Sequence, residues 1–359
     1  MVKKSNNIIT GYKAFDPDFT WRGYQFEVGK TVEYDGKIDH FSDGFYFYYT
    51  NPIDIFRDYP LIDENGLPLR FAKISSARRD AMLDPYRIGA VTSKINIDKE
   101  LSFQEVVRTG IKEEIKKEDR WGRSCYRRIA REPNEYLTTS VEHVRLISKK
   151  FNTHVAMLHR YSLAVVSGIK SRLASCGFEN RLITIGKNDR ISSSGFDTQV
   201  YSRGKEVRVA SSGERAKLQI VSLKATVASS GDEAELRIVG NGTSVASSGE
   251  KSTVCTRGNN ASVSVSGHST KLTVTGKRTR MAAVGDGNQV IYDGTDGVIS
   301  VLGMGAEFKG SEGTLVSAVV YNATGKPIDI ITGRIGEKGL KPDTLYTVCE
   351  GKFVALEAA

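Results

Sequence analysis

The sequence predicts a mainly β protein: a two-faced parallel β-solenoid, preceded by a small α+β module with helices and followed by a β C-terminal cap. Two observations carry the prediction. Glycine falls on every ninth residue from Gly168 to Gly303, with Ser222 as the one exception. The fifth residue after each of these positions is apolar, from Leu173 to Ile299. A fixed period of this kind is typical of one structural unit stacked on itself.

Each nine-residue unit is expected to be one short strand and a turn. In residues 216–220, Ala-Lys-Leu-Gln-Ile, apolar and polar side chains alternate, which is the pattern of a half-buried strand. Nine residues are too few to bring the chain back above its starting point, so we predict an eighteen-residue coil of two strands and two turns. Pairs of serines support this spacing: residues 193–194, 211–212, 229–230 and 247–248.

Odd and even units then form two different sheets. In one sheet the inward residues are all apolar, as in Ala216, Leu218 and Ile220. In the other, the third inward position is a serine ladder, whose hydroxyls we expect to hydrogen-bond one another and the turn backbone. The ladder comprises Ser175, Ser193, Ser211, Ser229 and Ser247, and ends at Val265.

The outward residues of this second sheet predict an interaction face. Its central column holds only alanine and serine, whereas the opposite face is larger and mixed. A flat sheet packs well against the chain's own helices, a second copy, or another protein. The alternative is that small residues merely suit a tight roll. The column comprises Ala174, Ser192, Ala210, Ala228, Ala246, Ser264, Ala282 and Ser300.

The sequence lacks the residue patterns of three other activities known in repeat proteins. Calcium-binding β-rolls need double glycines with a regular aspartate in each turn, and these turns have neither. Ice binding needs a threonine array, and polysaccharide cleavage needs clustered carboxylates. The five histidines lack metal or triad spacing. We therefore predict no metal site and no cofactor.

The composition is basic, with a net charge of +9, but Lys and Arg are interleaved with acids along the chain. The densest stretch lies beside Trp121 and Tyr126, and arginines among aromatics can bind single-stranded nucleic acid or another polyanion. The alternative is a solvated helix face. The candidate contacts are Arg123, Arg127, Arg128 and Arg131. Four scattered cysteines indicate reduced thiols, and we expect no signal peptide and no membrane segment.

The flanking regions divide the chain into residues 1–98, 99–158, 159–310 and 311–359. Strands are expected at 8–15, 26–34, 44–49 and 71–75, and Asn51 followed by Pro52 indicates a helix start. Helices are expected at 102–117 and 134–152, and segment 134–158 is expected to cap the open sheet edges of the solenoid. The strands of the C-terminal cap are expected at 315–321, 327–332, 344–348 and 352–356.

Both ends of the chain resemble an uncharacterised family encoded mainly by bacteriophages and prophages. The resemblance rests on residues 12–15, 22–30, 42–46, 51–56 and 59–60, and on a tail at 341–348 and 351–354. Members carry two cysteines and a histidine in the central motif, whereas this chain has Phe41 and Tyr49 at the cysteine positions and Tyr46 at the histidine position. A thiol or imidazole site therefore does not carry over. The resemblance implies a phage protein in the host cytoplasm or the virion.

The N-terminal module also faintly resembles the mono-ADP-ribosyltransferase fold. The matching residues would be Arg22 and Tyr46, with Glu100 or Glu105 as the acid. The favoured interpretation of the whole chain is a phage-encoded structural or protein-binding scaffold, whose partner is a second copy or another phage or host protein. The alternative is a phage effector that acts on a host protein or nucleotide through this module.

Overall fold

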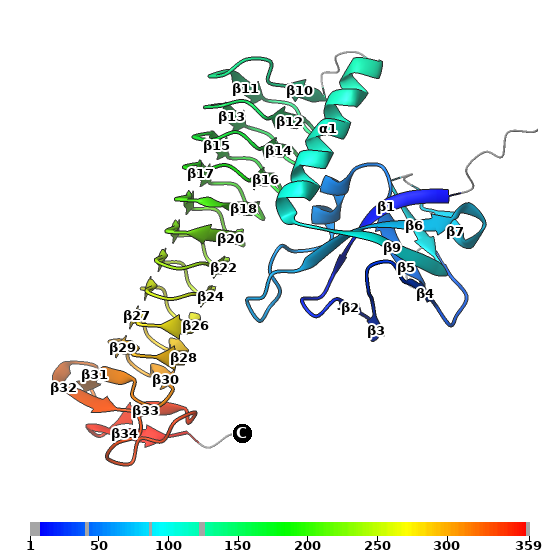
Figure 1. The fold of residues 1–359 in the computed structure, drawn as a ribbon. Coiled ribbons are helices and arrows are strands. Elements are labelled where there is room, and N and C mark those ends of the chain that lie inside the picture. Colours follow the sequence, from blue (N-terminus) through cyan, green and yellow to red (C-terminus); the bar gives the residue numbers. More distant parts are fainter. Residues whose placement is uncertain (1–7, 40–42, 86–87, 122–125, 357–359) are drawn as a thin grey trace, which may run out of the picture. The chain divides into compact units, whose positions relative to one another are not determined.

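A computed structural model describes the chain except for residues 1–7, 40–42, 86–87, 122–125 and 357–359. The chain divides into two compact units, residues 1–124 and 125–359. The first is an α+β module and the second contains the solenoid (Figure 1). The mainly β prediction with a parallel solenoid is confirmed.

The first unit is built on a seven-stranded antiparallel sheet of order β4-β9-β6-β1-β5-β8-β7. A short hairpin, β2 and β3, lies outside it. The helical elements are the 3-10 helices η1 (Pro52–Arg57) and η2 (Arg78–Asp80) and the helix α1 (Phe103–Trp121). The strands are β1 (Ile8–Phe15), β2 (Thr20–Trp21), β3 (Tyr24–Gln25), β4 (Thr31–Glu33), β5 (Phe45–Tyr48), β6 (Arg70–Ala77), β7 (Ala81–Leu83), β8 (Gly89–Thr92) and β9 (Lys94–Leu101).

Asn51 joins η1 to α1. Its side-chain oxygen accepts from Ile53 N at 2.9 Å, so the predicted cap is confirmed, although the helix it starts is a 3-10 helix. Its amide nitrogen donates to Glu114 Oε1 at 2.7 Å. The start of α1 is a capping box: Glu105 N donates to Ser102 Oγ, and Ser102 N donates to Glu105 Oε2 at 2.8 Å.

The second unit stacks two sheets back to back. The even-strand sheet contains β10, β12 and so on to β30, and the odd-strand sheet contains β11, β13 and so on to β31, with eleven parallel strands in each. Even strands are β10 (Arg127–Ile129), β12 (Arg145–Ser148), β14 (Leu163–Val166), β16 (Arg181–Thr184), β18 (Gln199–Lys205), β20 (Lys217–Leu223), β22 (Glu235–Val239), β24 (Thr253–Arg257), β26 (Lys271–Lys277), β28 (Gln289–Thr295) and β30 (Glu307–Lys309). Odd strands are β11 (Tyr136–Thr139), β13 (His154–Met157), β15 (Arg172–Ser175), β17 (Arg190–Ser193), β19 (Arg208–Ser211), β21 (Thr226–Ser229), β23 (Ser244–Ser247), β25 (Ser262–Val265), β27 (Arg280–Ala283), β29 (Val298–Val301) and β31 (Leu315–Tyr321).

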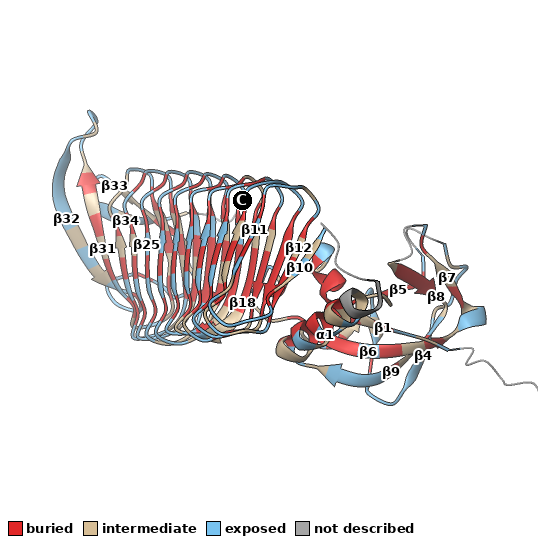
Figure 2. Cartoon of the chain, turned by 90° about the horizontal axis from the view of Figure 1, so that it is seen from above, coloured by how far each residue is buried: buried red, intermediate tan, exposed pale blue. Residues whose placement is uncertain are grey.

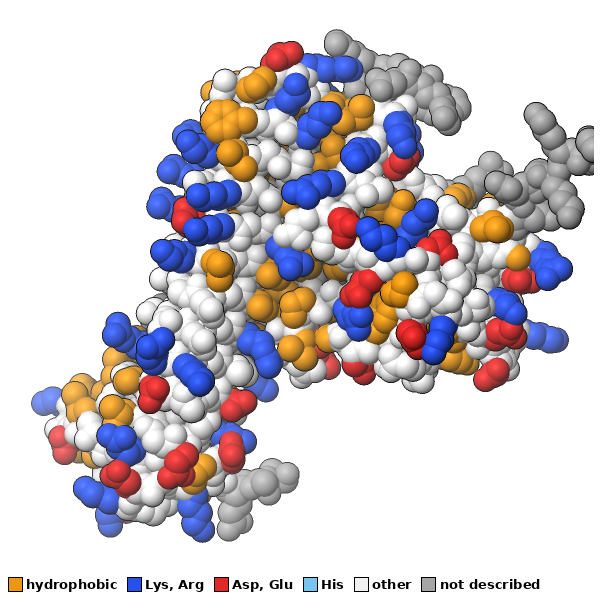
Figure 3. All heavy atoms as spheres, viewed as in Figure 1, with side chains coloured by type: hydrophobic (Ala, Val, Ile, Leu, Met, Phe, Trp, Pro, Cys, Tyr) orange, Lys and Arg blue, Asp and Glu red, His pale blue; other side chains and the backbone are white. Residues whose placement is uncertain are grey.

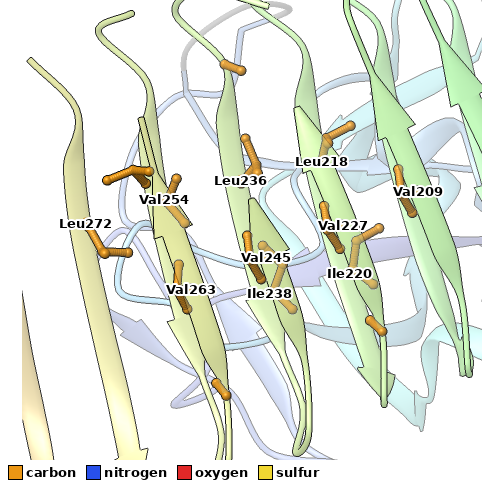
Figure 4. Close-up of a cluster of buried hydrophobic side chains, with 14 of the residues drawn as sticks. Val209, Leu218, Ile220, Val227, Leu236, Ile238, Val245, Val254, Val263 and Leu272 are labelled. Atoms are coloured by element: carbon orange, nitrogen blue, oxygen red, sulfur yellow. The ribbon is translucent and has the colours of Figure 1, made fainter. Parts of the chain in front are cut away.

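The coil repeats every eighteen residues, as predicted. Leu218 lies above Leu236 and Val209 above Val227 in the parallel ladders. Buried and exposed residues alternate along the strands (Figure 2). The inward residues of both sheets meet in one apolar core, and Leu218, Ile220, Val227 and Leu236 are each 1% exposed or less (Figure 4).

The repeated glycine is required by close stacking. A Cβ added to Gly195 would overlap the carbonyl oxygen of Gly177 in the preceding coil. The left-handed backbone occurs two residues further on, where most turns have a residue other than glycine, such as Asp197 with φ 52°. The nine-residue spacing therefore marks where consecutive coils touch.

Two expectations about the solenoid are wrong. The segment expected to be a helix at 134–152 forms β11 and β12, so it consists of coils in the ladder and is not a helical cap. The expected hydrogen bonds along the serine ladder are absent too. The hydroxyls of Ser193, Ser211, Ser229 and Ser247 have no partner among the described residues. Side chains in matching conformations keep the strand spacing of about 4.8 Å, which is too long for a hydroxyl hydrogen bond.

The chain ends in antiparallel strands. β32 (Pro327–Arg334) pairs with β31, the last strand of the odd-strand sheet. β33 (Tyr346–Cys349) pairs with β30 and with β34 (Lys352–Ala355). Both sheets are thereby closed by strands of opposite direction, and Tyr346 stacks on Phe308 with ring centroids 5.8 Å apart.

Candidate functional site

The outer face of the odd-strand sheet carries the predicted column of small residues. Its members from β15 to β25 are exposed, and Ala282 and Ser300 are half-buried. Beside it runs a second small column, which closes each strand: Cys176, Ser194, Ser212, Ser230, Ser248 and Ser266. Together the two columns, which we call the small-residue face, line a shallow groove of about 550 Å³.

A third column on the same sheet changes character along the solenoid. Its first five residues are large: Tyr136, His154, Arg172, Arg190 and Arg208, each stacked on the next in the ladder. We call these five the arginine column. The next three, Thr226, Ser244 and Ser262, are small and exposed, and a second shallow groove of about 570 Å³ lies there.

The arginine column was missed by the sequence reading, although its three arginines recur every eighteen residues. Each side chain is exposed, and no guanidinium of the three has a hydrogen bond or ion pair among the described residues. Tyr136, 70% exposed, stacks on His154 with ring centroids 4.5 Å apart. The column is therefore a line of planar and cationic groups open to solvent.

The two edges of the solenoid differ in charge. Turns that lead from even to odd strands form a basic edge, and Lys and Arg side chains gather over the first coils in Figure 3. The basic edge carries Lys149, Lys150, Lys170, Lys187, Arg203, Lys205, Lys224, Arg257, Lys277 and Arg278. Turns that lead from odd to even strands form an acidic edge, with Glu142, Glu179, Asp197, Glu214, Asp232, Glu233, Glu250 and Asp286. Arg160, Arg215 and Lys251 also lie on the acidic edge, and Glu206, Asp293 and Asp296 lie on the basic edge. Each edge therefore carries an excess of one sign of charge, which is not visible along the chain.

Two arginines of the predicted polyanion stretch lie in the even-strand sheet, and Arg131 lies in the turn from β10 to β11. Arg127 and Arg128 begin β10 of the even-strand sheet, so neither belongs to a helix face. Arg128 donates to the carbonyl oxygen of Thr138 at 2.8 Å. The backbone N–H of Arg131 donates to Glu135 at 2.5 Å, and Arg123 lies outside the described residues.

In the N-terminal unit, Arg22 and Tyr46 surround a buried lysine. Lys13 Nζ donates to the carbonyl oxygen of Tyr46 at 3.0 Å and lies 3.9 Å from the centroid of the Trp21 ring. The Arg22 guanidinium lies 4.7 Å from the same centroid. Burial lowers the pKa of Lys13 to about 7, and the charge of Arg22 adds to the effect. The Tyr46 hydroxyl donates to Asp84 at 2.8 Å, and burial raises its pKa.

The two candidate acids have structural partners. Glu100 forms a two-bond ion pair with Arg70, at 2.8 and 2.7 Å, and this holds the pKa of the carboxyl below its usual value. Glu105 pairs with Lys99 at 2.8 Å and accepts from Ser102, which lowers its pKa to about 2. Both carboxyls are therefore held ionised by neighbours that belong to the fold.

Comparison with known proteins gives one match. A family described as a domain of unknown function, DUF7666, matches residues 9–109, which lie within the first unit. No curated protein and no solved structure matches the chain. In the described part of the chain, no helix is both long and apolar enough to cross a membrane.

Proposed function

We propose that the chain is a scaffold whose solenoid pairs with a second copy through the small-residue face. The observation that carries this proposal is the combination of flatness and charge over β21, β23 and β25. In these three strands all three outward columns are small, with Ala228, Ala246 and Ser264 in the centre. The flat strip is bordered by Lys224, Arg257 and Lys277 on one side. On the other side lie three acids, Asp232, Glu233 and Glu250, and one cation, Lys251.

The edge charges select one arrangement. When two copies face each other with their axes in the same direction, the basic edge of each lies against the acidic edge of the other. When the axes are opposed, basic meets basic and acidic meets acidic. Opposite charges across an interface favour one register and steer association, and like charges disfavour it. We therefore expect a parallel pair.

The area of the small-residue face indicates how strongly two copies should bind. Eight rungs about 4.8 Å apart, across a width of about 13 Å, give about 450 Å² for each copy. Twice this area is about 900 Å², below the range of most stable complexes, so the pair is expected to be weak and to depend on its edge charges. Added salt should therefore dissociate it.

Light scattering tests the pairing. At low salt and high protein concentration the mass should approach that of two 39.4 kDa chains, and it should fall at 0.5 M salt. Ala228→Trp with Ala246→Trp should give a monomer at all concentrations. Thr253→Trp, on an exposed position of the even-strand sheet, is the matched control and should leave the mass unchanged. A wild-type chain that is monomeric throughout would contradict the proposal.

The resemblance of residues 12–60 and 341–354 to phage and prophage proteins supports a bacteriophage setting for this scaffold, as a virion component or a host-takeover factor. The two roles differ in where the protein is found. A virion component should be present in purified particles at a fixed stoichiometry, whereas a host-takeover factor should appear early in infection and be absent from particles. Absence from phage-infected cells at every stage would contradict both.

A further inference from the structure

The first coils of the solenoid carry an arrangement of charge that stability does not explain. Arg172, Arg190 and Arg208 occupy directly neighbouring positions on parallel strands about 4.8 Å apart. Like charges directly opposite one another destabilise a sheet. None of the three has an anionic partner among the described residues. The arrangement is therefore suited to an anion that comes from outside the chain.

The basic edge extends this field. Lys170 and Lys187 stand in the turns that precede Arg172 and Arg190, Lys205 ends β18 shortly before Arg208, and all three lysines are exposed. Within residues 149–224, all of which the structure describes, the turns of this edge hold one acid outside the core, Glu206, which lies 3.8 Å from Lys205. A surface lined by one sign of charge attracts a polyanion along its whole length.

Aromatic rings at the start of the same surface indicate the kind of polyanion. Tyr136 and His154 continue the arginine column as a stacked pair. Phe151, 41% exposed, lies at the basic edge with Lys170 Nζ 5.7 Å from its ring centroid. Exposed rings beside a cationic groove are how proteins bind the bases and the backbone of a single strand. A polyanion without bases has no rings that could stack on these side chains.

We propose that the arginine column and the adjoining basic edge bind single-stranded nucleic acid along the solenoid axis. From Tyr136 to Arg208 the column has five rungs separated by four intervals, about 19 Å in all, which corresponds to about six nucleotides at the spacing of a stacked strand. The cations contact the phosphates, and the Tyr136 and His154 rings stack on one or two bases. A duplex hides its bases from such rings, so the single strand is the better ligand.

Fluorescence anisotropy with the full chain tests the proposal, using labelled oligo-dT and oligo-U of twenty nucleotides and a duplex of the same length. The test variant combines Arg172→Gln, Arg190→Gln and Arg208→Gln. The control variant removes the same charge away from the column, through Lys217→Gln, Lys251→Gln and Lys271→Gln. We expect the test variant to weaken binding more than tenfold, and to reduce the slope of log K against log salt by about 2. The control should change affinity less than threefold.

Tyr136→Ala separates a nucleic acid from other polyanions. It should weaken oligonucleotide binding about tenfold, because one stacked base is lost, and leave inorganic polyphosphate binding unchanged. Comparison of oligo-dT with oligo-U shows whether DNA or RNA is preferred. The proposal is overturned by equal losses in the test and control variants, by tighter binding of the duplex, by an unchanged oligonucleotide affinity in Tyr136→Ala, or by no binding at low salt. Circular dichroism of each variant checks that the solenoid is intact.

Discussion

Asp189 offers the sharpest test of the physical description of the solenoid. Its carboxyl lies inside the turn before β17 and is fully buried. It accepts from Ser171 N at 2.9 Å and from Gly186 N at 3.1 Å. Burial raises its pKa to about 7, although these hydrogen bonds act in the opposite direction. Above neutral pH the ionised carboxyl in the core therefore lowers the stability of the folded protein.

The perturbation is Asp189→Asn, which removes the charge and keeps the shape. The chain itself places asparagine at the same position of other nine-residue units, in turns of the opposite edge. Asn180 accepts from Ser162 N and Asn288 accepts from Thr270 N, both at 2.7 Å. The amide nitrogen of Asn288 donates to Gly285 O at 2.7 Å, whereas Asp189 Oδ2 accepts from Gly186 N. An asparagine at position 189 therefore keeps the bond from Ser171 N and has to rotate its amide nitrogen away from Gly186 N, at the cost of one hydrogen bond.

The magnitude follows from linkage. The folded pKa of Asp189, about 7, lies above the unfolded value of 3.8, so the folded state binds the extra proton between about pH 4 and pH 7. Stability from this group is present below pH 4 and is lost as the pH rises through 7. A difference of about 3 pKa units corresponds to about 4 kcal/mol at most. We expect Asp189→Asn to raise the free energy of unfolding by about 2 to 4 kcal/mol at pH 8, and by little at pH 4.5.

Urea unfolding followed by circular dichroism at the two pH values measures this difference. Asn288→Asp is the matched reverse substitution, and it should lower stability at pH 8 and recover it at pH 4.5. If Asp189→Asn is no more stable than the wild type at pH 8, or if the difference is independent of pH, the carboxyl does not titrate as a buried group and the reasoning fails.

Three further substitutions test the core, each by urea unfolding. Gly195→Ala should lower the free energy of unfolding by about 3 kcal/mol or more, because the added methyl group overlaps the Gly177 carbonyl. Gly305→Ala, with open space around it and φ 63°, should lower it by about 1 kcal/mol. Equal losses would exclude the stacking explanation. Ser211→Ala removes a buried hydroxyl without a described partner and should raise stability by about 1 kcal/mol. Ser175→Ala removes an acceptor 2.8 Å from the Asn180 amide and should lower stability. A loss of stability in Ser211→Ala would show that its hydroxyl has a partner. The wild type should gain stability between pH 7 and pH 10, because the lowered pKa of Lys13 makes the unfolded state bind one more proton than the folded state in this range. Lys13→Met should abolish this gain. An unchanged pH dependence would contradict the effect of burial on Lys13.

The sequence predicted the solenoid because each rung of a parallel ladder repeats the same contacts. It missed the first coils because Val141, Lys150 and His159 stand where later coils have glycine. Leu137, Val141, Val144 and Ile147 keep helical spacing, and that short-range pattern prevailed over the eighteen-residue offset linking Leu137 to Val155 and Leu173. Testing that offset along the whole chain would have identified the first coils as strands.

The N-terminal unit was harder to predict because its contacts are long-range. Strands 8–15 and 71–75 were expected, but their pairing, with Tyr12 opposite Lys73, follows from no local pattern. β7, β8 and β9 were not expected, and residues 26–34 form a separate short strand and turn instead of one strand. Lys13 looks like a surface residue in the sequence, and only the sheet shows that it is buried among aromatic rings.

The column of small residues was predicted from the sequence and the arginine column was not, although both repeat every eighteen residues. Along the chain, Lys and Arg alternate with Asp and Glu and suggest no binding site. When residues are grouped by their position within the coil, one edge carries mostly cations and the other mostly acids. In this solenoid, residues eighteen apart in the sequence are neighbours in space. A surface feature is therefore recognised by comparing residues at this spacing, and not by composition along the chain.

The arginine column lies on the same sheet as the face proposed to pair, and this gives a last test. In a parallel pair, the arginine column of one copy lies next to the acidic edge of the other, so a second copy and a single strand compete for the same cations. Coupling between two binding events is reciprocal. A saturating oligonucleotide should therefore shift the scattering mass toward one protein chain, and the monomeric Ala228→Trp and Ala246→Trp variant should bind the oligonucleotide at least as tightly as the wild type. A pair that retains its mass with the oligonucleotide bound would show that the arginine column lies outside the protein interface.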